Sequence, residues 1–242
     1  MKLHILKRFF GILTDLIYPR RCPVCDKAVK PFGSLICEEC KDRFVYIKAP
    51  FCGKCGKELK DKRAFYCHDC AVKAHSYDKG MALFSYESAA QSIYRFKYRG
   101  RQEYAAYYGE RMAQILGKRI LELKPDALVP VPIHSSKRRI RGYNQAELIA
   151  KELGQRLNIP VKTDLVHRIR KTQPMKNLSS QERQNNLKKA FKIGSFDVKL
   201  YTIIIIDDIY TTGSTIDAVA DELRSAGIKN VYYAALAIGR GI

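Results

Sequence analysis

The chain has 242 residues, a length that allows one large domain or a small domain followed by a medium one. Hydrophobic residues make up 46% of the chain, which suffices for a buried core and excludes a globally disordered protein. Lysine and arginine outnumber aspartate and glutamate by 44 to 24, and the formal net charge of +20 favours an anionic partner such as nucleic acid, a phosphate compound or an anionic membrane surface.

Residues 1–19 are predicted to form an amphipathic helix. Pro19 ends a helical pattern of apolar residues at Leu3, Leu6, Phe10, Leu13 and Ile17. The sequence has no long apolar run, so we expect no membrane-spanning helix, and no small-residue cleavage site follows that would indicate a secretory signal. The helix is expected to dock onto the following domain, with a membrane-proximal position as the alternative.

Residues 20–76 contain all eight cysteines, in four Cys-x-x-Cys pairs whose first members recur every 15 residues. Such a pair can turn both sulfurs toward one tetrahedral metal, and two pairs complete a zinc site. We therefore predict a double zinc ribbon that depends on its two zinc ions for stability. The predicted ligands are Cys22, Cys25, Cys37, Cys40, Cys52, Cys55, Cys67 and Cys70.

The spacing leaves the pairing order of the cysteines open. Consecutive pairing gives the first four to one ion and the last four to the other, and the spacing does not exclude an interleaved arrangement. A disulfide framework and an iron–sulfur cluster are alternatives to zinc. His68 and His75 are expected to be bystanders, because four thiolates complete each site.

Residues 77–242 alternate between strand and helix patterns. Residues 201–206 are apolar on both faces, which indicates a central parallel strand. Further strands are predicted at 81–86, 127–131, 161–166 and 230–238, a polar loop at 167–180, and helices at 88–98, 103–121, 143–157, 181–189 and 214–226. This order predicts an α/β domain with a parallel sheet flanked by helices.

The residues after the central strand predict a phosphate site. Asp207 and Asp208 precede a turn of small and hydroxyl-bearing residues, which are Thr211, Thr212, Gly213, Ser214 and Thr215. Backbone N–H groups at a helix N-terminus suit a phosphate, and ligands bind at the carboxyl ends of parallel strands. The carboxylates suit sugar hydroxyls, or Mg²⁺ through its waters. The pattern indicates a phosphorylated sugar; the alternative is a helix cap beside a solvated turn.

Residues 203–215 resemble the 5-phosphoribosyl-1-pyrophosphate (PRPP) signature of type I phosphoribosyltransferases: four apolar residues, two acids, two further residues and Thr-Thr-Gly-x-Thr. The resemblance implies that Asp207 and Asp208 are catalytic and bind the ribose hydroxyls, that residues 211–215 bind the 5-phosphate, and that Mg²⁺ accompanies PRPP. Together with Val129-Pro130-Val131-Pro132, Arg141-Gly142-Tyr143-Asn144-Gln145 and the ribbons, the chain resembles the ComF family of competence proteins, whose layout GntX-type proteins share.

Two basic segments fall where the family fold has its pyrophosphate loop and its mobile loop. Arginine forks match phosphate oxygens, so these segments are expected to bind the pyrophosphate. A solvated basic loop is the alternative for the first segment. The candidates are Lys137, Arg138, Arg139 and Arg141 in the first segment, and Arg168, Arg170 and Thr172 in the second.

The resemblance implies a cytoplasmic factor of natural transformation that handles single-stranded DNA with a ComFA-type helicase and recombination factors. Aromatic residues beside cations suit single-strand binding, and core packing is the alternative for them. The aromatic candidates are Tyr94, Phe96, Tyr98, Tyr104, Tyr107 and Tyr108, interleaved with Arg95, Lys97, Arg99 and Arg101, and a second basic surface is Lys54, Lys57, Lys60, Lys62 and Arg63.

Two other functions fit parts of the sequence. An active phosphoribosyltransferase or a PRPP sensor would use the same site with an unknown nitrogen acceptor, but no obvious pocket for a purine or pyrimidine base appears in residues 80–104 or after residue 238. A zinc-ribbon transcription or RNA factor would explain the cysteines and leave the two aspartates unused.

Overall fold

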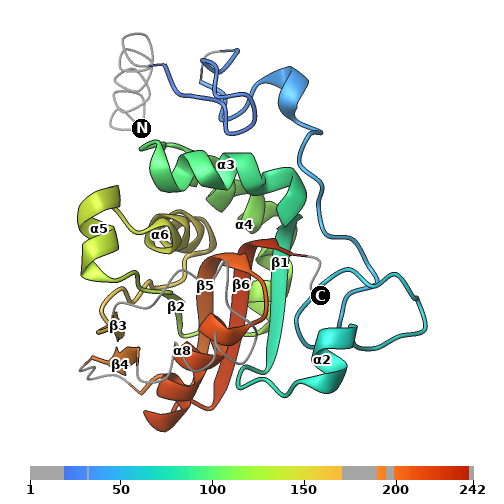
Figure 1. Ribbon diagram of the computed structural model, residues 1–242, viewed down its shortest axis with the longest axis vertical. Helices are drawn as coiled ribbons and strands as arrows, with labels where there is room; N and C mark the ends of the chain where they lie inside the picture. Colours follow the sequence, from blue (N-terminus) through green and yellow to red (C-terminus); the bar gives the residue numbers. More distant parts are fainter. Residues whose placement is uncertain (1–18, 32, 171–189, 195–198, 240–242) are drawn as a thin grey trace.

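The computed structural model describes residues 19–31, 33–170, 190–194 and 199–239, so the predicted helix at 1–19 lies outside the described residues. A parallel sheet of four strands forms the core, in the order β1-β6-β5-β2 (Figure 1). The strands are β1 (Lys79–Ser85), β2 (Ala127–Pro130), β5 (Thr202–Tyr210) and β6 (Asn230–Ile238). Residues 203–206 are fully buried, as expected of a central strand with both faces covered.

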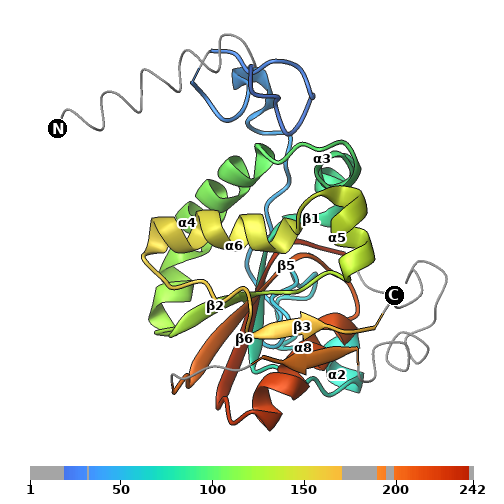
Figure 2. The same ribbon diagram turned by 90° about the vertical axis from the view of Figure 1, so that its left-hand side faces the viewer.

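Helices cover both faces of the sheet. Figure 2 shows α4 (Tyr104–Glu122) and α6 (Gln145–Leu157) on one side and α8 (Ser214–Ser225) on the other, while α3 (Tyr86–Tyr98) adds to the first layer. Alternate residues of β5 divide between the two cores: Ile204 and Ile206 pack with the first layer, and Ile203 and Ile205 pack with α8. The predicted flanked parallel sheet is confirmed.

The central strand extends further than predicted. β5 pairs with β6 as far as Tyr210 opposite Ile238, whereas its pairing with β2 stops at Ile206 opposite Pro130. The apolar pattern ends at the two aspartates, but the backbone hydrogen bonds to β6 continue. Asp207 and Asp208 therefore lie on β5 itself, on the stretch that projects beyond β2.

The predicted basic loop after β2 is instead a helix, α5 (Ser135–Arg141). The His134 side chain accepts a hydrogen bond from the Ser136 backbone N–H, and Gly142 ends the helix with a φ of 80°. These two caps define a seven-residue helix that has no buried residue, so no apolar periodicity marked it in the sequence.

Two other predictions need correction. The strand expected at 161–166 is reduced to a bridge between Val161 and Leu128. Part of the expected loop at 167–180 belongs to β3 (Val166–Arg168), which pairs antiparallel with β4 (Phe191–Ile193). The remainder of that loop from residue 171, and the helix expected at 181–189, lie outside the described residues.

The two cysteine-rich segments dock at different places on the sheet domain (Figure 1). The first contacts α3, where Arg95 Nη1 donates to the Val24 carbonyl at 3.0 Å. It also contacts the start of α4 and the loop before it, where Asp26 accepts from the Tyr104 hydroxyl and Arg101 Nε, both at 2.7 Å. The second lies beside β1, where the Gly80 N–H donates to the Lys54 carbonyl at 2.7 Å. Short helices η1 (Glu38–Cys40) and α2 (His68–Val72) each carry the last cysteine of their segment.

Candidate functional site

The two aspartates at the end of β5 are held in a partly buried position. The Asp208 N–H donates to Asp207 Oδ1 at 2.8 Å, and Lys97 Nζ on α3 donates to Asp208 Oδ1 at 2.8 Å. Burial, and then the negative charge of Asp208, raise the pKa of Asp207 to about 7. The acid pair therefore does not form a solvated turn, and Asp207 is poised to change its ionisation near neutral pH.

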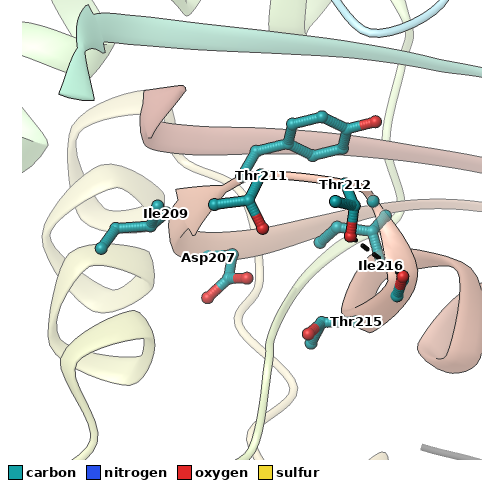
Figure 3. Close-up of a pocket in the computed structure, with 9 residues that line it drawn as sticks. Asp207, Ile209, Thr211, Thr212, Thr215 and Ile216 are labelled. Atoms are coloured by element: carbon teal, nitrogen blue, oxygen red, sulfur yellow. Dashed lines mark hydrogen bonds between the residues drawn. The ribbon is translucent and has the colours of Figure 1, made fainter. Parts of the chain in front are cut away.

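The predicted phosphate turn, residues 211–215, borders a shallow hollow that is open to solvent (Figure 3). Asp207, Thr211, Thr212 and Thr215 lie around this hollow. Gly213 supplies the N-cap of α8 with a φ of 76°, a backbone conformation that favours glycine. The hydroxyls of Thr212 and Ser214 are 3.0 Å apart. Small side chains thus leave space at the N-terminus of a twelve-residue helix, as phosphate binding requires.

Cations from three elements gather beside the aspartates. Burial, followed by the positive charges of Arg168, Arg141 and Lys97, lowers the pKa of Lys137 on α5. Burial also lowers the pKa of Arg168 on β3, against the attraction of Asp207. The shift of Lys137 shows that several of its charged neighbours are cations, and an anion placed among them would relieve their repulsion. One edge of the sheet thus offers carboxylates, a turn with backbone donors, and three basic residues. We call these three, Lys137, Arg141 and Arg168, the cationic group.

Three other predicted basic residues are exposed to solvent. Arg138 points to Glu147, with Nη1 and Oε2 3.0 Å apart, and its side chain is 58% exposed. Arg139 and Arg170 are exposed. Thr172 lies outside the described residues. Lys97 is the residue that sequence reasoning missed in this role, because it is 111 positions from Asp208 and no local pattern joins them.

The eight cysteines form two separate clusters. Cys22, Cys25, Cys37 and Cys40 make one and Cys52, Cys55, Cys67 and Cys70 the other, with all sulfurs of a cluster within 4.8 Å of one another. This is the consecutive pairing, and the interleaved alternative is wrong. All eight are free thiols, so the disulfide alternative is also wrong.

The donor sets fit two zinc ions. Four sulfurs at this separation match a tetrahedral zinc site. Burial and the charge of Cys22 raise the pKa of Cys40 to about 12, so four thiolates need a bound cation to coexist. Neither nearby histidine belongs to a cluster: the His68 side chain is 83% exposed, and His75 turns toward Asp217.

Two of the six candidate aromatic residues are exposed. Tyr94 is 50% exposed and Tyr98 is 57% exposed, and their ring centroids lie 5.1 Å apart on one face of α3. The guanidinium of Arg141 lies 4.9 Å from the Tyr98 centroid and donates to its hydroxyl at 3.1 Å. We call Tyr94, Tyr98 and Arg141 the tyrosine surface. The stacking role is wrong for the other four, which are core residues: Phe96, Tyr104, Tyr107 and Tyr108.

The predicted basic surface of the second ribbon is only partly formed. Lys57 is 9% exposed and pairs with Asp69 at 2.8 Å, so it stabilises the ribbon from within. Lys60, Lys62 and Arg63 are exposed.

Comparison with known proteins matches both parts of the chain. Residues 13–71 match the model of the double zinc ribbon domain, and residues 108–241 match the model of the phosphoribosyl transferase domain. Competence protein F of Haemophilus influenzae is 31% identical over 87% of this chain and 93% of its own length. The DNA utilization protein YhgH of Salmonella typhimurium is 29% identical over 87% of this chain and 86% of its own length, and competence protein ComFC of Bacillus subtilis is 27% identical over 79% of each.

No helix in the described part of the chain combines the length and apolar character needed to cross a bilayer.

Proposed function

The chain belongs to the ComF family of competence proteins, and from that premise we propose that it is a DNA-uptake factor that contacts incoming single-stranded DNA and binds PRPP. The relatives are named for competence and for DNA utilization. The observation that carries the proposal is that Arg141 belongs to two neighbouring features. Its guanidinium lies over Tyr98, and its charge acts on Lys137 in the cationic group beside the aspartates.

The tyrosine surface suits a single strand without sequence preference. Exposed rings accept stacked bases, and arginine beside them contacts both the rings and the phosphates. The net charge of +20 adds an attraction for the backbone that weakens as salt rises. Binding here would bring the strand next to the sugar-phosphate site. A protein with this role would act in the cytoplasm. Its partners would be a ComFA-type helicase and recombination factors.

Three groups of residues at the edge of the sheet suit the three parts of PRPP, which are its ribose, its 5-phosphate and its pyrophosphate. The side-chain oxygens of Asp207 and Asp208 accept hydrogen bonds from the ribose hydroxyls, once Lys97 yields its contact with Asp208. Residues 211–215 hold the 5-phosphate, and Lys137, Arg141 and Arg168 hold the pyrophosphate. Mg²⁺, bound by the pyrophosphate and through water by the aspartates, would neutralise charge between them.

Catalytic turnover is the second candidate function. The cationic group would stabilise a departing pyrophosphate, and transfer of the phosphoribosyl group to a nitrogen acceptor needs such stabilisation. Release of pyrophosphate from PRPP with ammonia or a free base as acceptor would establish a transferase. Binding of PRPP without release, across such acceptors, would establish a sensor.

Single-strand binding is tested with a labelled oligonucleotide and a double variant, Tyr94→Ala with Tyr98→Ala. We expect affinity to fall about tenfold or more, because stacking contributes about 1–3 kcal/mol per base. Tyr201→Ala is the matched control, since Tyr201 is 47% exposed and also lies beside a cation, Lys229. Fluorescence anisotropy over a salt series measures both variants. Equal loss in the two variants, or no binding by the wild type at low salt, would contradict the proposal.

A further inference from the structure

The phosphate turn is held by the chain segment that follows the second cysteine cluster. Lys73 Nζ donates to the Thr212 carbonyl at 3.2 Å and to Asp217 Oδ2 at 3.1 Å. His75 Nδ1 lies 2.9 Å from Asp217 Oδ2, and the Ser76 N–H donates to Asp217 Oδ1 at 3.1 Å. The Asp217 side chain is 11% exposed and that of His75 is 1% exposed. One buried carboxylate at the start of α8 thus gathers three donors from residues 73–76.

The same segment touches the turn itself. A Cβ on Gly213 would lie 2.7 Å from the Tyr210 hydroxyl and 2.8 Å from His75 Cε1, so the backbone of the turn is packed directly on these side chains. The Tyr77 and Tyr210 hydroxyls are 2.7 Å apart and buried. A shift of residues 73–77 would therefore displace the turn, because no gap separates the two.

The position of residues 73–77 depends in turn on the second cysteine cluster. Cys70 lies on α2, a helix of five residues that Lys73 closes by donating its N–H to the Asp69 carbonyl at 3.0 Å. None of the residues of α2 is buried, so a helix this short depends on its attachments to the ribbon, which are the Lys57–Asp69 pair and a metal at Cys70. Tyr233 makes a second connection between the cluster and the turn. Its hydroxyl donates to the Cys55 carbonyl at 2.7 Å, and its ring stacks on that of Tyr210.

We propose that Asp217 is a positioning residue that couples the second metal centre to the phosphate turn. Metal bound by the second cluster orders residues 73–77, and these hold the turn through Asp217 in the arrangement that binds phosphate. Because such coupling is reciprocal, phosphate at the turn also stabilises the metal. The inference rests on the proposed sugar-phosphate site, and its test below separates the two.

The first cysteine cluster provides an internal control. Asp26 plays a similar bridging part there, accepting from Arg101 and Tyr104, but it joins the first ribbon to the start of α4 and the loop before it. Asp26→Asn thus removes a carboxylate that joins the first ribbon to the sheet domain, at a position distant from the phosphate turn. Asp217→Asn removes the equivalent charge beside it while preserving the side-chain volume.

The test titrates ribose 5-phosphate and inorganic pyrophosphate separately into the zinc-loaded wild type, Asp217→Asn and Asp26→Asn. Ribose 5-phosphate needs the turn, whereas pyrophosphate needs the cationic group of Lys137, Arg141 and Arg168. We expect Asp217→Asn to bind ribose 5-phosphate about tenfold more weakly, about 1.4 kcal/mol, with pyrophosphate unchanged. Asp26→Asn should bind both as the wild type does. Equal weakening of both ligands in Asp217→Asn would show a general structural defect and overturn the proposal.

Reciprocity is tested by the rate at which a chelator exposes thiols to alkylation, located by mass spectrometry. Ribose 5-phosphate should slow alkylation of Cys67 and Cys70 severalfold in the wild type and leave that of Cys22 and Cys37 unchanged. Asp217→Asn should lose this protection. Equal protection of both clusters, or protection retained in Asp217→Asn, would overturn the coupling.

Hydrogen exchange separates this inference from the proposed function. If ribose 5-phosphate does not bind the wild type, the sugar-phosphate proposal fails, and exchange at residues 211–216 decides the coupling without a ligand. Faster exchange there in Asp217→Asn than in Asp26→Asn supports the coupling. Equal exchange in the two variants overturns it.

Discussion

At the scale of single residues, Asp207 has the most unusual environment in the described site. Its pKa is raised from 3.8 to about 7 by burial and by Asp208, so the fold favours its protonated form. In the unfolded chain the carboxyl ionises near pH 4. Between about pH 4 and pH 7 the folded state binds more protons at this residue than the unfolded state, so its contribution to stability falls as pH rises.

Asp207→Asn should therefore stabilise the ligand-free protein at pH 8, because the amide carries no charge to desolvate. We expect a gain of about 1–4 kcal/mol that shrinks as pH falls toward 4. Thermal unfolding at pH 5 and pH 8 measures it. Asp221→Asn, which changes an exposed acid on α8, is the control and should have little effect. A less stable Asp207→Asn protein at pH 8 would contradict the burial of this charge.

The residues of the turn were predictable from sequence, whereas their partners were not. The Asp-Asp and Thr-Thr-Gly-x-Thr pattern is local, and the chemistry of each side chain indicates a sugar phosphate without knowledge of the fold. Lys97 and Asp217 owe their positions to partners 111 and 142 residues away in the chain. No spacing rule joins such pairs, because only the packing of α3 and of the second ribbon brings them together.

At the scale of elements, the strands and helices are stabilised by their apolar cores, whereas each ribbon is built around a cluster of four cysteines. Regular spacing of the Cys-x-x-Cys pairs predicted the eight ligands but left their pairing order open, and the fold brings consecutive pairs together. By contrast, α5 was missed because its helical state comes from His134 and Gly142 at its ends and not from an apolar face. The extension of β5 was missed because backbone pairing with β6 outlasts the apolar pattern.

Native mass spectrometry should find two zinc ions per chain, one for each cluster of four cysteines. Cys37→Ser should leave one ion, because replacing one thiolate disrupts only its own site. Cys67→Ser should also leave one, and only this variant should lose affinity for ribose 5-phosphate. One ion in the wild type, or none, would contradict two independent centres.

At the scale of the whole molecule, the tyrosine surface and the predicted phosphate turn occupy neighbouring parts of the sheet domain, and each lies near one ribbon. The first ribbon docks on α3, the helix that presents Tyr94 and Tyr98, and the second docks beside β1 and the phosphate turn (Figure 1). Arg141 connects the tyrosine surface to the cationic group. This layout brings the proposed DNA-contacting surface, the proposed sugar-phosphate site and two four-cysteine clusters together on one sheet domain.

Calorimetric titration with PRPP and Mg²⁺ tests the central claim most directly. The wild type and a double variant, Asp207→Asn with Asp208→Asn, are compared at pH 8, which is above the raised pKa of Asp207. We predict that the wild type binds PRPP and that the double variant binds it at least a hundredfold more weakly, roughly 3 kcal/mol, because two carboxylate acceptors for the ribose hydroxyls are lost. Equal affinity in the two proteins, or no binding by the wild type, would contradict the account.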